Sequence, residues 1–275
     1  MTNQELFQMV GIRPEPAVPQ GKRNKREGFP WISVILLTAI VLCCLFAEVL
    51  MTKDPSYLDL ENFNVAPNRE FLFGTDTLGR DIFSGIWYGG RISITIGFLS
   101  TLISTLIAIV YGSVSGIGPV WLDTLMMRFT EIFLSVPGLL LVLFLQAILG
   151  EANVWTLSIV IGVTGWASIA KVIRTEVRQI RNSEYVIASR CMGGKFFHIL
   201  SKHLAPNFIA SIMFMVVMNV RGAISSESTL SFMGMGLGLE IISWGSMLSL
   251  SEKALLTDSW WIIIIPGAFL VTLLM

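Results

Sequence analysis

Apolar residues dominate several long stretches of this chain, and polar residues gather between them. A helix needs about 20 apolar residues, each adding 1.5 Å, to cross the hydrocarbon core of a bilayer. Six stretches approach that length, at residues 31–51, 92–115, 131–149, 154–170, 208–225 and 260–275. The pattern therefore predicts an all-α, polytopic membrane protein with about six transmembrane helices.

The composition agrees with a membrane protein. Of the 275 residues, 53% are hydrophobic and only 14% are charged, whereas a soluble domain carries about a quarter charged residues. The formal net charge is zero, so the chain as a whole has no excess of positive charge that would attract nucleic acid.

The polar segments divide the chain. Residues 1–30 form a polar head, and the apolar run 31–51 that follows is too long for a signal peptide, so we expect a retained first helix. Residues 52–91 form a polar loop rich in Pro, Asn, Asp and Gly. Residues 92–275 form the main membrane core, which includes a polar loop at about 175–207.

Basic residues predict the orientation of these segments, because they concentrate on the cytoplasmic side. Five lie in residues 1–30 and seven in residues 171–207, which together hold 12 of the 19 in the chain. The segment 52–91 has four basic and six acidic residues. The head and the loop are thus expected in the cytoplasm, and segment 52–91 outside. Four predicted helices separate head and loop, as that orientation requires.

Small residues and one proline punctuate the apolar runs. The glycines in question are Gly97, Gly112, Gly116, Gly138, Gly162 and Gly165. We expect them to permit close helix packing rather than to act as gates. Pro137 is expected to kink the third predicted helix or to begin a new one.

The loop at about 175–207 contains a short charged helix. Ser183 is a candidate N-cap, Glu184 lies near the positive end of the helix, and Gly193 can take the left-handed conformation that ends it. The pattern leaves two interpretations open. The loop either docks on a partner protein or lies as an amphipathic helix on lipid headgroups.

The stretch from Glu184 to Asn207 resembles the EAA loop of ABC-importer permeases. That pattern is Glu-Ala-Ala, three residues, Gly, nine residues, then Ile-x-Leu-Pro. Here Ile187-Ala188-Ser189 stands at the Glu-Ala-Ala position, Gly193 at the glycine, and His203-Leu204-Ala205-Pro206 at the close. Ile187 replaces the motif glutamate, and Glu184 fits an acidic position common in one subfamily. The resemblance implies an ATPase-coupling loop that contains Glu184, Ile187, Ala188, Ser189, Arg190, Gly193, His203 and Pro206.

Three further segments resemble the dipeptide/oligopeptide/nickel permeases, in that family's order over about 200 residues. They are Phe73 to Asp81 with Tyr88 to Ser93, then Met127 to Ile132, and Glu227 to Gly236 with Ser243 to Gly245. The chain is most similar in type to the second, C-type permease of a peptide-importer pair. The first segment supplies a candidate extracytoplasmic motif of Gly74, Thr75, Asp76, Gly79, Arg80 and Asp81. This motif either contacts a binding protein or folds over the outer mouth, and the second interpretation is favoured because these residue types form turns.

The resemblance implies the ABC type I importer permease fold in a bacterial or archaeal cytoplasmic membrane, with the N-terminus in the cytoplasm. It also implies a second homologous permease, two ATP-binding subunits and an extracytoplasmic substrate-binding protein as partners. The chain has no GxxxxGK[ST] motif, so we expect ATP and Mg to bind the partner subunits and this subunit to be non-catalytic. It stops at Met275 within apolar sequence, where family members add a polar tail, so that end is expected to be incomplete.

Polar residues within apolar runs are candidates for a transport pathway. Asn219, Arg221 and Glu227 lie on or near the fifth predicted helix, and Gln146 on the third. Arg221 could meet a peptide carboxylate, but we expect it to reach the outer interface or to pair with Glu227. The two histidines, His198 and His203, lack further ligands at helical spacing, so no metal site is predicted.

Three alternatives to a peptide importer can be compared with the sequence. The first is the same importer carrying nickel or a metal chelate, and the second is a stand-alone channel or secondary transporter. An intramembrane enzyme is the third, and it would need paired acids, HExxH or a Ser–His pair within a helix, none of which the sequence contains.

Overall fold

The computed structural model describes residues 31–238 and 240–275. Within these ranges it leaves out the side chains of Ile32, Leu60, Arg190, Phe196, Phe197, His203, Asn207 and Glu252. The predicted cytoplasmic head, residues 1–30, lies outside the described residues. The chain divides into two units, residues 1–38 and 39–275. All contacts described below lie within the second.

The described part of the chain is helical and contains no β-strand, which confirms the all-α prediction. The α-helices are α1 (Trp31–Leu45), α2 (Ala47–Leu50), α3 (Ile82–Ile117), α4 (Val120–Ser135), α5 (Gly138–Leu149), α6 (Val154–Ile180), α7 (Glu184–Cys191), α8 (Phe196–Ile199), α9 (Ala205–Phe232), α10 (Trp244–Leu248), α11 (Ser251–Leu256) and α12 (Trp261–Leu274). Two short turns join them, the 3-10 helix η2 (Leu60–Asn62) and the π-helical turn η3 (Leu200–Leu204).

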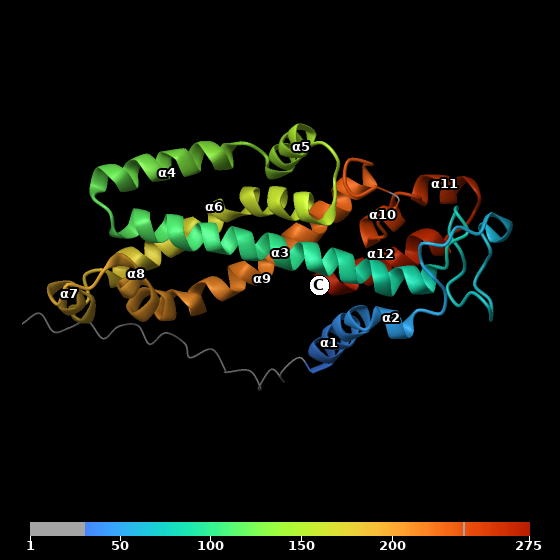
Figure 1. Ribbon diagram of the computed structural model, residues 1–275, viewed down its shortest axis with the longest axis horizontal. Coiled ribbons are helices and arrows are strands. Elements are labelled where there is room, and N and C mark those ends of the chain that lie inside the picture. The colour runs from blue at the N-terminus through green and yellow to red at the C-terminus, as the bar shows by residue number, and fades with distance from the viewer. Residues whose placement is uncertain (1–30, 239) are drawn as a thin grey trace, which may run out of the picture. The chain divides into compact units, whose positions relative to one another are not determined.

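Three long helices, α3, α6 and α9, run lengthwise beside one another (Figure 1). Each contains a segment long and apolar enough to cross a membrane, at Ile82–Ile117, Val154–Ile180 and Phe208–Phe232. The 36 residues of α3 span about 54 Å, which exceeds the ~30 Å hydrocarbon core. We call the end of this bundle where α7 and α8 lie the α7 end, and the opposite end the α10 end.

Helix α3 begins at Ile82, although its apolar run predicts a start at Ile92. The cause is a cap. The Asp81 side chain accepts a hydrogen bond from the Ser84 backbone N–H (3.0 Å), which satisfies a free donor of the first turn. The polar loop therefore ends at Asp81 rather than at residue 91.

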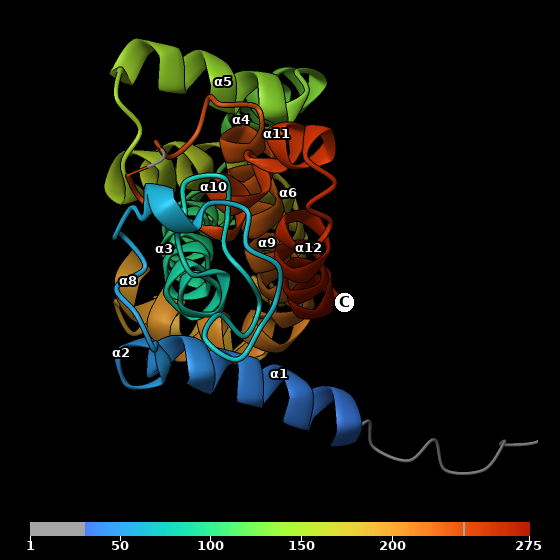
Figure 2. The same cartoon turned by 90° about the vertical axis from the view of Figure 1, so that its right-hand side faces the viewer.

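The third predicted helix, 131–149, is not continuous, because Pro137 begins a new helix, one of the two outcomes predicted for it. It divides into α4 and α5, whose axes differ by 88°. The break falls at Val136 and Pro137, where Val136 takes an extended conformation and Pro137 precedes the first residue of α5. Proline disfavours the α conformation in the residue before it. Figure 2 shows α5 crossing the view while α4 recedes behind it. The first and last predicted helices are also shorter than expected, since α1 has 15 residues and α12 has 14.

Glycines bring α3 and α6 into close contact. A Cβ atom on Gly112 would lie 2.6 Å from the Ala170 carbonyl oxygen, and one on Gly162 would lie 2.8 Å from Ile103 Cβ. These distances confirm the predicted packing role. Gly138 is an exception, because a Cβ there would meet nothing within 4 Å.

Each end of the bundle is held together by its own buried hydrophobic core. The α7-end core joins α6, α7, α8 and α9 through the buried side chains of Ile173, Val177, Val186, Ile199, Leu200, Leu204, Phe208 and Ile212. The α10-end core joins α3, α10, α11 and α12 through Ile82, Ile86, Ile242, Trp244, Met247, Leu250, Ala254, Trp261 and Ile262.

Candidate functional site

The predicted coupling loop forms a short helix, α7, that is anchored by one face. Val186 is fully buried in the α7-end core, beside Ile173 and Val177 of α6 and Phe208 of α9. Ser189 follows at helical spacing and is also buried. Because one core holds α7 and the adjoining ends of α6 and α9, these elements form a single packed unit.

The opposite face of α7 is open. Glu184, Ile187, Ala188 and Cys191 follow one another at spacings of three, one and three residues, and all are exposed. Such spacing places them on one side of a helix. Ile187 is 49% exposed. The structure thus presents an apolar strip with an acidic residue at its start.

Gly193 ends α7 as predicted, in the left-handed conformation with φ +81°. The Gly194 N–H donates to the Ser189 carbonyl (2.9 Å), which is the six-to-one bond of a Schellman turn. A Cβ on Gly193 would meet nothing within 4 Å. The requirement for glycine here is therefore conformational rather than spatial.

Ser183 lies directly before α7, at the predicted N-cap position, but its side chain bonds backwards along the chain. Its hydroxyl donates to the Ile180 carbonyl (2.7 Å), and its own carbonyl accepts from the Val186 and Ile187 N–H groups (3.1 Å each). Pro206 lies in the first turn of α9, where proline is tolerated. The side chains of Arg190 and His203 lie outside the described residues, and His198 is exposed. Within the described ranges, no group of three His, Cys, Asp or Glu side chains could hold a metal ion.

An acidic residue that the sequence analysis missed lies where α3, α4 and α6 meet. Asp123, in the first turn of α4, is 5% exposed. Arg174 of α6 donates to both its oxygens, with Nε to Oδ1 at 2.8 Å and Nη2 to Oδ2. Arg178 Nη1 donates to Oδ2 (2.8 Å), and the Ser115 hydroxyl of α3 donates to Oδ1 (2.7 Å). One carboxylate thus ties three helices together near the α7 end.

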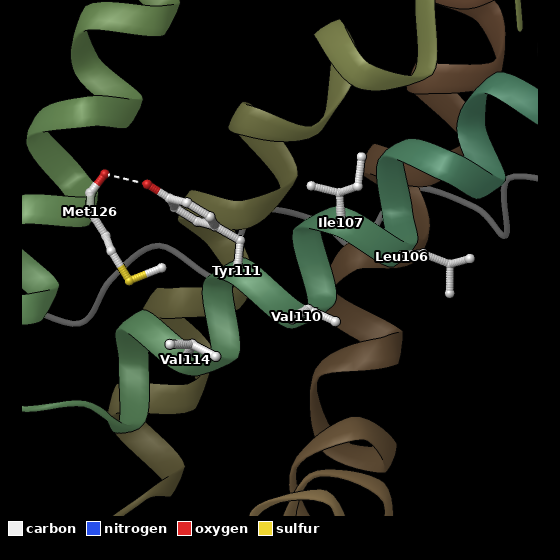
Figure 3. A pocket seen from close by; sticks show the side chains of 6 residues that line it. All are labelled: Leu106, Ile107, Val110, Tyr111, Val114 and Met126. Atoms are coloured by element: carbon white, nitrogen blue, oxygen red, sulfur yellow. Dashed lines mark hydrogen bonds between the residues drawn. The ribbon is translucent and has the colours of Figure 1, made fainter. Parts of the chain in front are cut away.

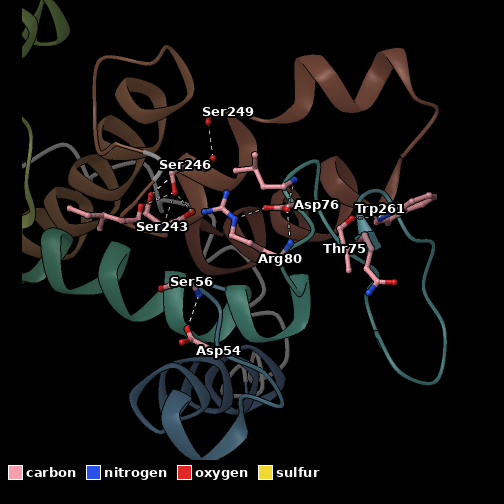
Figure 4. Close-up of polar contacts among 12 residues, drawn as sticks. Asp54, Ser56, Thr75, Asp76, Arg80, Ser243, Ser246, Ser249 and Trp261 are labelled. Carbon is pink, nitrogen blue, oxygen red and sulfur yellow. Dashed lines mark hydrogen bonds and ion pairs between the residues drawn. The ribbon is translucent and has the colours of Figure 1, made fainter. Parts of the chain in front are cut away.

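The motif between residues 74 and 81 folds on itself at the α10 end (Figure 4). Its six candidate residues are all buried. Asp76 accepts a hydrogen bond from the Arg80 side chain (Nε to Oδ2, 2.9 Å), so two residues of the motif form a buried ion pair. Gly79 has φ +77°, and a side chain there would overlap the Asp59 backbone. The Thr75 carbonyl accepts from the Trp261 indole (3.1 Å), so the motif is fixed to α12.

Glu227 of α9 lies fully buried near the α10 end. Four hydroxyls donate to its carboxyl group. They come from Ser93 (3.0 Å), Ser228 (3.3 Å), Ser231 (3.0 Å) and Ser243 (2.7 Å). These donors belong to α3, to α9 itself and to the cap of α10. The carboxyl group therefore joins three elements.

The predicted pathway residues do not come together. Arg221 is exposed, and the partners of Glu227 within the described residues are the four serines, so the expected Arg221–Glu227 pair is not formed. Six residues are one and two-thirds turns of helix, which places the two side chains on different faces. Asn219 is half-buried and donates to the Gly165 carbonyl at 3.5 Å. Gln146 is buried and bonds the Gly150 carbonyl of its own helix cap (3.0 Å).

An apolar groove of about 510 Å³ lies between α3 and α4. Figure 3 shows its lining, which comprises Leu106, Ile107, Val110, Tyr111, Val114 and Met126. The Tyr111 hydroxyl is satisfied by the Met126 carbonyl (2.6 Å). The groove thus offers no free polar group to orient a ligand.

The positions of Asp123, Arg174 and Arg178 in the sequence already mark them as candidates for a functional contact. Asp123 is the only acidic residue between Asp81 and Glu131, and an ionisable residue within apolar helices is a functional candidate by default. Arg174 and Arg178 are four residues apart, so they face the same direction. Nothing in the sequence alone places the start of α4 against that face.

Comparison with known proteins agrees with this architecture. Residues 108–275 match the family described as the binding-protein-dependent transport system inner membrane component. A solved inward-facing structure of the MetNI methionine ABC transporter aligns with a TM-score of 0.50 at 15% identity, over 69% of this chain and 96% of that one. That likeness concerns the fold alone, which is the ABC type I importer permease fold.

Curated relatives cover most of the chain. The dipeptide transport system permease protein DppC of Bacillus subtilis (strain 168) is 35% identical over 90% of this chain and 78% of its own length. The oligopeptide transport system permease protein OppC of the same organism is 36% identical over 90% of this chain and 81% of its own length. A putative peptide permease protein of Brucella suis biovar 1 (strain 1330) is 32% identical over 97% and 88%. The chain therefore belongs to the family of binding-protein-dependent transport system inner membrane components.

Proposed function

We propose that this chain is a transmembrane permease subunit of an ABC importer that moves di- or oligopeptides across the cytoplasmic membrane. The relatives named above are peptide permeases, and they support peptides as the cargo. The complex would contain a second homologous permease, two ATP-binding subunits and an extracytoplasmic binding protein. ATP and Mg would bind the ATPase subunits, so this chain would be non-catalytic.

The observation that carries the proposal is the two-sided character of α7. Its buried face shares one core with α6 and α9, while its other face exposes Ile187 and Ala188. A partner that moves α7 would therefore move both long helices with it, since packed cores shift as units rather than deform continuously. We propose that the exposed strip of α7 binds an ATPase subunit. Helix α7 and the N-terminus would then both lie on the cytoplasmic side of the membrane.

The segment 74–81 takes a structural role in this proposal. Because its six candidate residues are buried, they would shape the outer end of the bundle rather than contact the binding protein directly. Arg221, on the exposed face of α9, remains the proposed pathway residue. Asn219 and Glu227 would hold α9 against α6 and α3.

Two variants test the docking surface. Ala188→Arg adds a long charged side chain to the exposed strip without entering the core, so we expect the ATPase subunits to be lost when the complex is purified through this chain. Leu255→Arg is the matched control, because Leu255 is 73% exposed on α11 at the opposite end. Equal recovery of ATPase subunits with both variants would contradict the proposal.

Uptake assays test the cargo. Vesicles that contain the whole complex and its binding protein should accumulate labelled dipeptides or oligopeptides only when ATP is present. Accumulation of nickel chelates instead would favour the nickel alternative. Transport by this chain without ATPase subunits would indicate a channel or secondary transporter.

A further inference from the structure

Asp123, Arg174, Arg178 and Ser115 form a junction between α3, α4 and α6. The proposed docking of α7 on an ATPase does not by itself require this junction. The Asp123 carboxylate is buried, yet it faces two guanidinium groups that are only partly covered, since the Arg174 and Arg178 side chains are 25% and 38% exposed. Removing a carboxylate from water is costly unless its partners are well placed. Its hydrogen bonds to Arg174, Arg178 and Ser115 supply such partners.

The junction lies in the last part of α6, from which the chain continues directly to α7. Helix α6 continues without a break past Arg174 and Arg178 to Ile180, and α7 starts at Glu184. A further contact secures the end of this helix, because Arg181 Nη1 donates to the Gly116 carbonyl of α3 (3.1 Å). The end of α6 together with Arg181, residues 171–181, is here called the stem, and these bonds tie it to α3 and α4.

We propose that Asp123 is a positioning residue for energy coupling, which locks the stem of α6 to α3 and α4 so that displacement of α7 carries all three helices. This inference rests on the proposed function of α7. Without the carboxylate, Arg174 and Arg178 would be like charges four residues apart on one face and would repel each other. The stem could then shift against α3 and α4, so motion at α7 would still reach α9 through the α7-end core but would pass less completely to α3 and α4.

The ratio of peptide taken up to ATP hydrolysed, measured in the same vesicles, tests this role. For Asp123→Asn we expect the ratio to fall about tenfold while hydrolysis continues, a size typical of coupling between sites. Asp123→Glu should recover most of the ratio, because the charge returns and the flexible arginines can retract by one methylene. Glu131→Gln is the matched control, since it removes an exposed acid paired with Arg128 on the same helix, and it should leave the ratio unchanged.

The ratio separates coupling from folding. A misfolded fraction lowers uptake and hydrolysis together and leaves their ratio as it was, so an unchanged ratio in Asp123→Asn would overturn the inference. Arg178→Gln is a milder variant in case Asp123→Asn fails to assemble. It should lower the ratio by less than Asp123→Asn does, because it removes one donor and leaves Arg174 in place. An unchanged ratio there would equally overturn it. If the unaltered complex shows no ATP-dependent uptake, the proposed function itself fails and this inference falls with it.

Discussion

The Ser243 hydroxyl donates a 2.7 Å hydrogen bond to the buried carboxyl group of Glu227, although the two residues lie on different elements. The same hydroxyl oxygen accepts from the Ser246 N–H (3.0 Å) and so caps α10. One side chain therefore links the start of α10 to the hydroxyl cluster that joins α3 and α9. This relationship makes Glu227 a structural hub rather than a free pathway residue.

Substitution of the hub should be costly. Glu227→Ala leaves four serine hydroxyls without their acceptor, and we expect the free energy of unfolding to fall by about 3 kcal/mol or more. Ser243→Ala removes one donor and one cap bond, and should cost about 1–2 kcal/mol. Thermal unfolding of the purified subunit in detergent measures both. A smaller loss for Glu227→Ala than for Ser243→Ala would contradict the hub.

The contact between α3 and α6 predicts a clear difference between two glycines. Gly112→Ala would place a Cβ 2.6 Å from the Ala170 carbonyl oxygen, so we expect a loss of about 1–3 kcal/mol from overpacking. Gly222→Ala is the matched control on α9, where a Cβ meets nothing within 4 Å, and alanine should be neutral or slightly stabilising. The midpoints of thermal unfolding in detergent compare the two, and equal shifts would argue against close packing at Gly112.

Gly193 predicts a conformational effect on coupling. Gly193→Val forces a β-branched residue into φ +81°, at a cost of about 1–3 kcal/mol, and should reduce both uptake and substrate-stimulated ATP hydrolysis. Gly193→Asn is the control, because asparagine tolerates the left-handed region, and it should retain most activity. Full uptake and hydrolysis with valine would show that the turn after α7 is not needed for coupling.

Two ion pairs near the α10 end should differ in their effects on stability. Asp76→Ala breaks a pair with Arg80 in which both side chains are 8% exposed, so we expect a loss of about 3 kcal/mol. Glu70→Gln breaks an exposed pair with Lys53 and should cost less than about 1 kcal/mol. Unfolding of the purified subunit compares them. The burial argument fails if Glu70→Gln is as harmful as Asp76→Ala.

Some features of the fold follow directly from local sequence. The apolar runs of α3, α6 and α9 locate the long helices because length and hydropathy suffice for that, and Gly193 marks the end of α7 because the residue alone permits its φ. The division at Pro137 was expected as a kink or a new helix, but its 88° angle depends on packing that no local pattern encodes.

Contacts between distant segments could not be predicted in the same way. Asp123 and Arg174 are 51 residues apart, and Ser93 and Glu227 are 134 apart. Pairing across such distances depends on how the helices cross. The sequence motifs did contain Glu227, Ser93 and Ser243, but the resemblance that marked them carried no geometry. Proximity along the chain suggests a pair between Arg221 and Glu227, but the helical phase places their side chains on different faces.

The most direct test of α7 as the ATPase contact uses the thiol of Cys191, which is exposed on the proposed docking strip. A membrane-impermeant maleimide is applied to inside-out vesicles, and the modified cysteine is identified by mass spectrometry. The account predicts that Cys191 reacts when this chain is present with its partner permease alone and is protected when the ATPase subunits are bound. Reaction only from the outer face of the membrane, or equal reaction with and without the ATPase subunits, would contradict it.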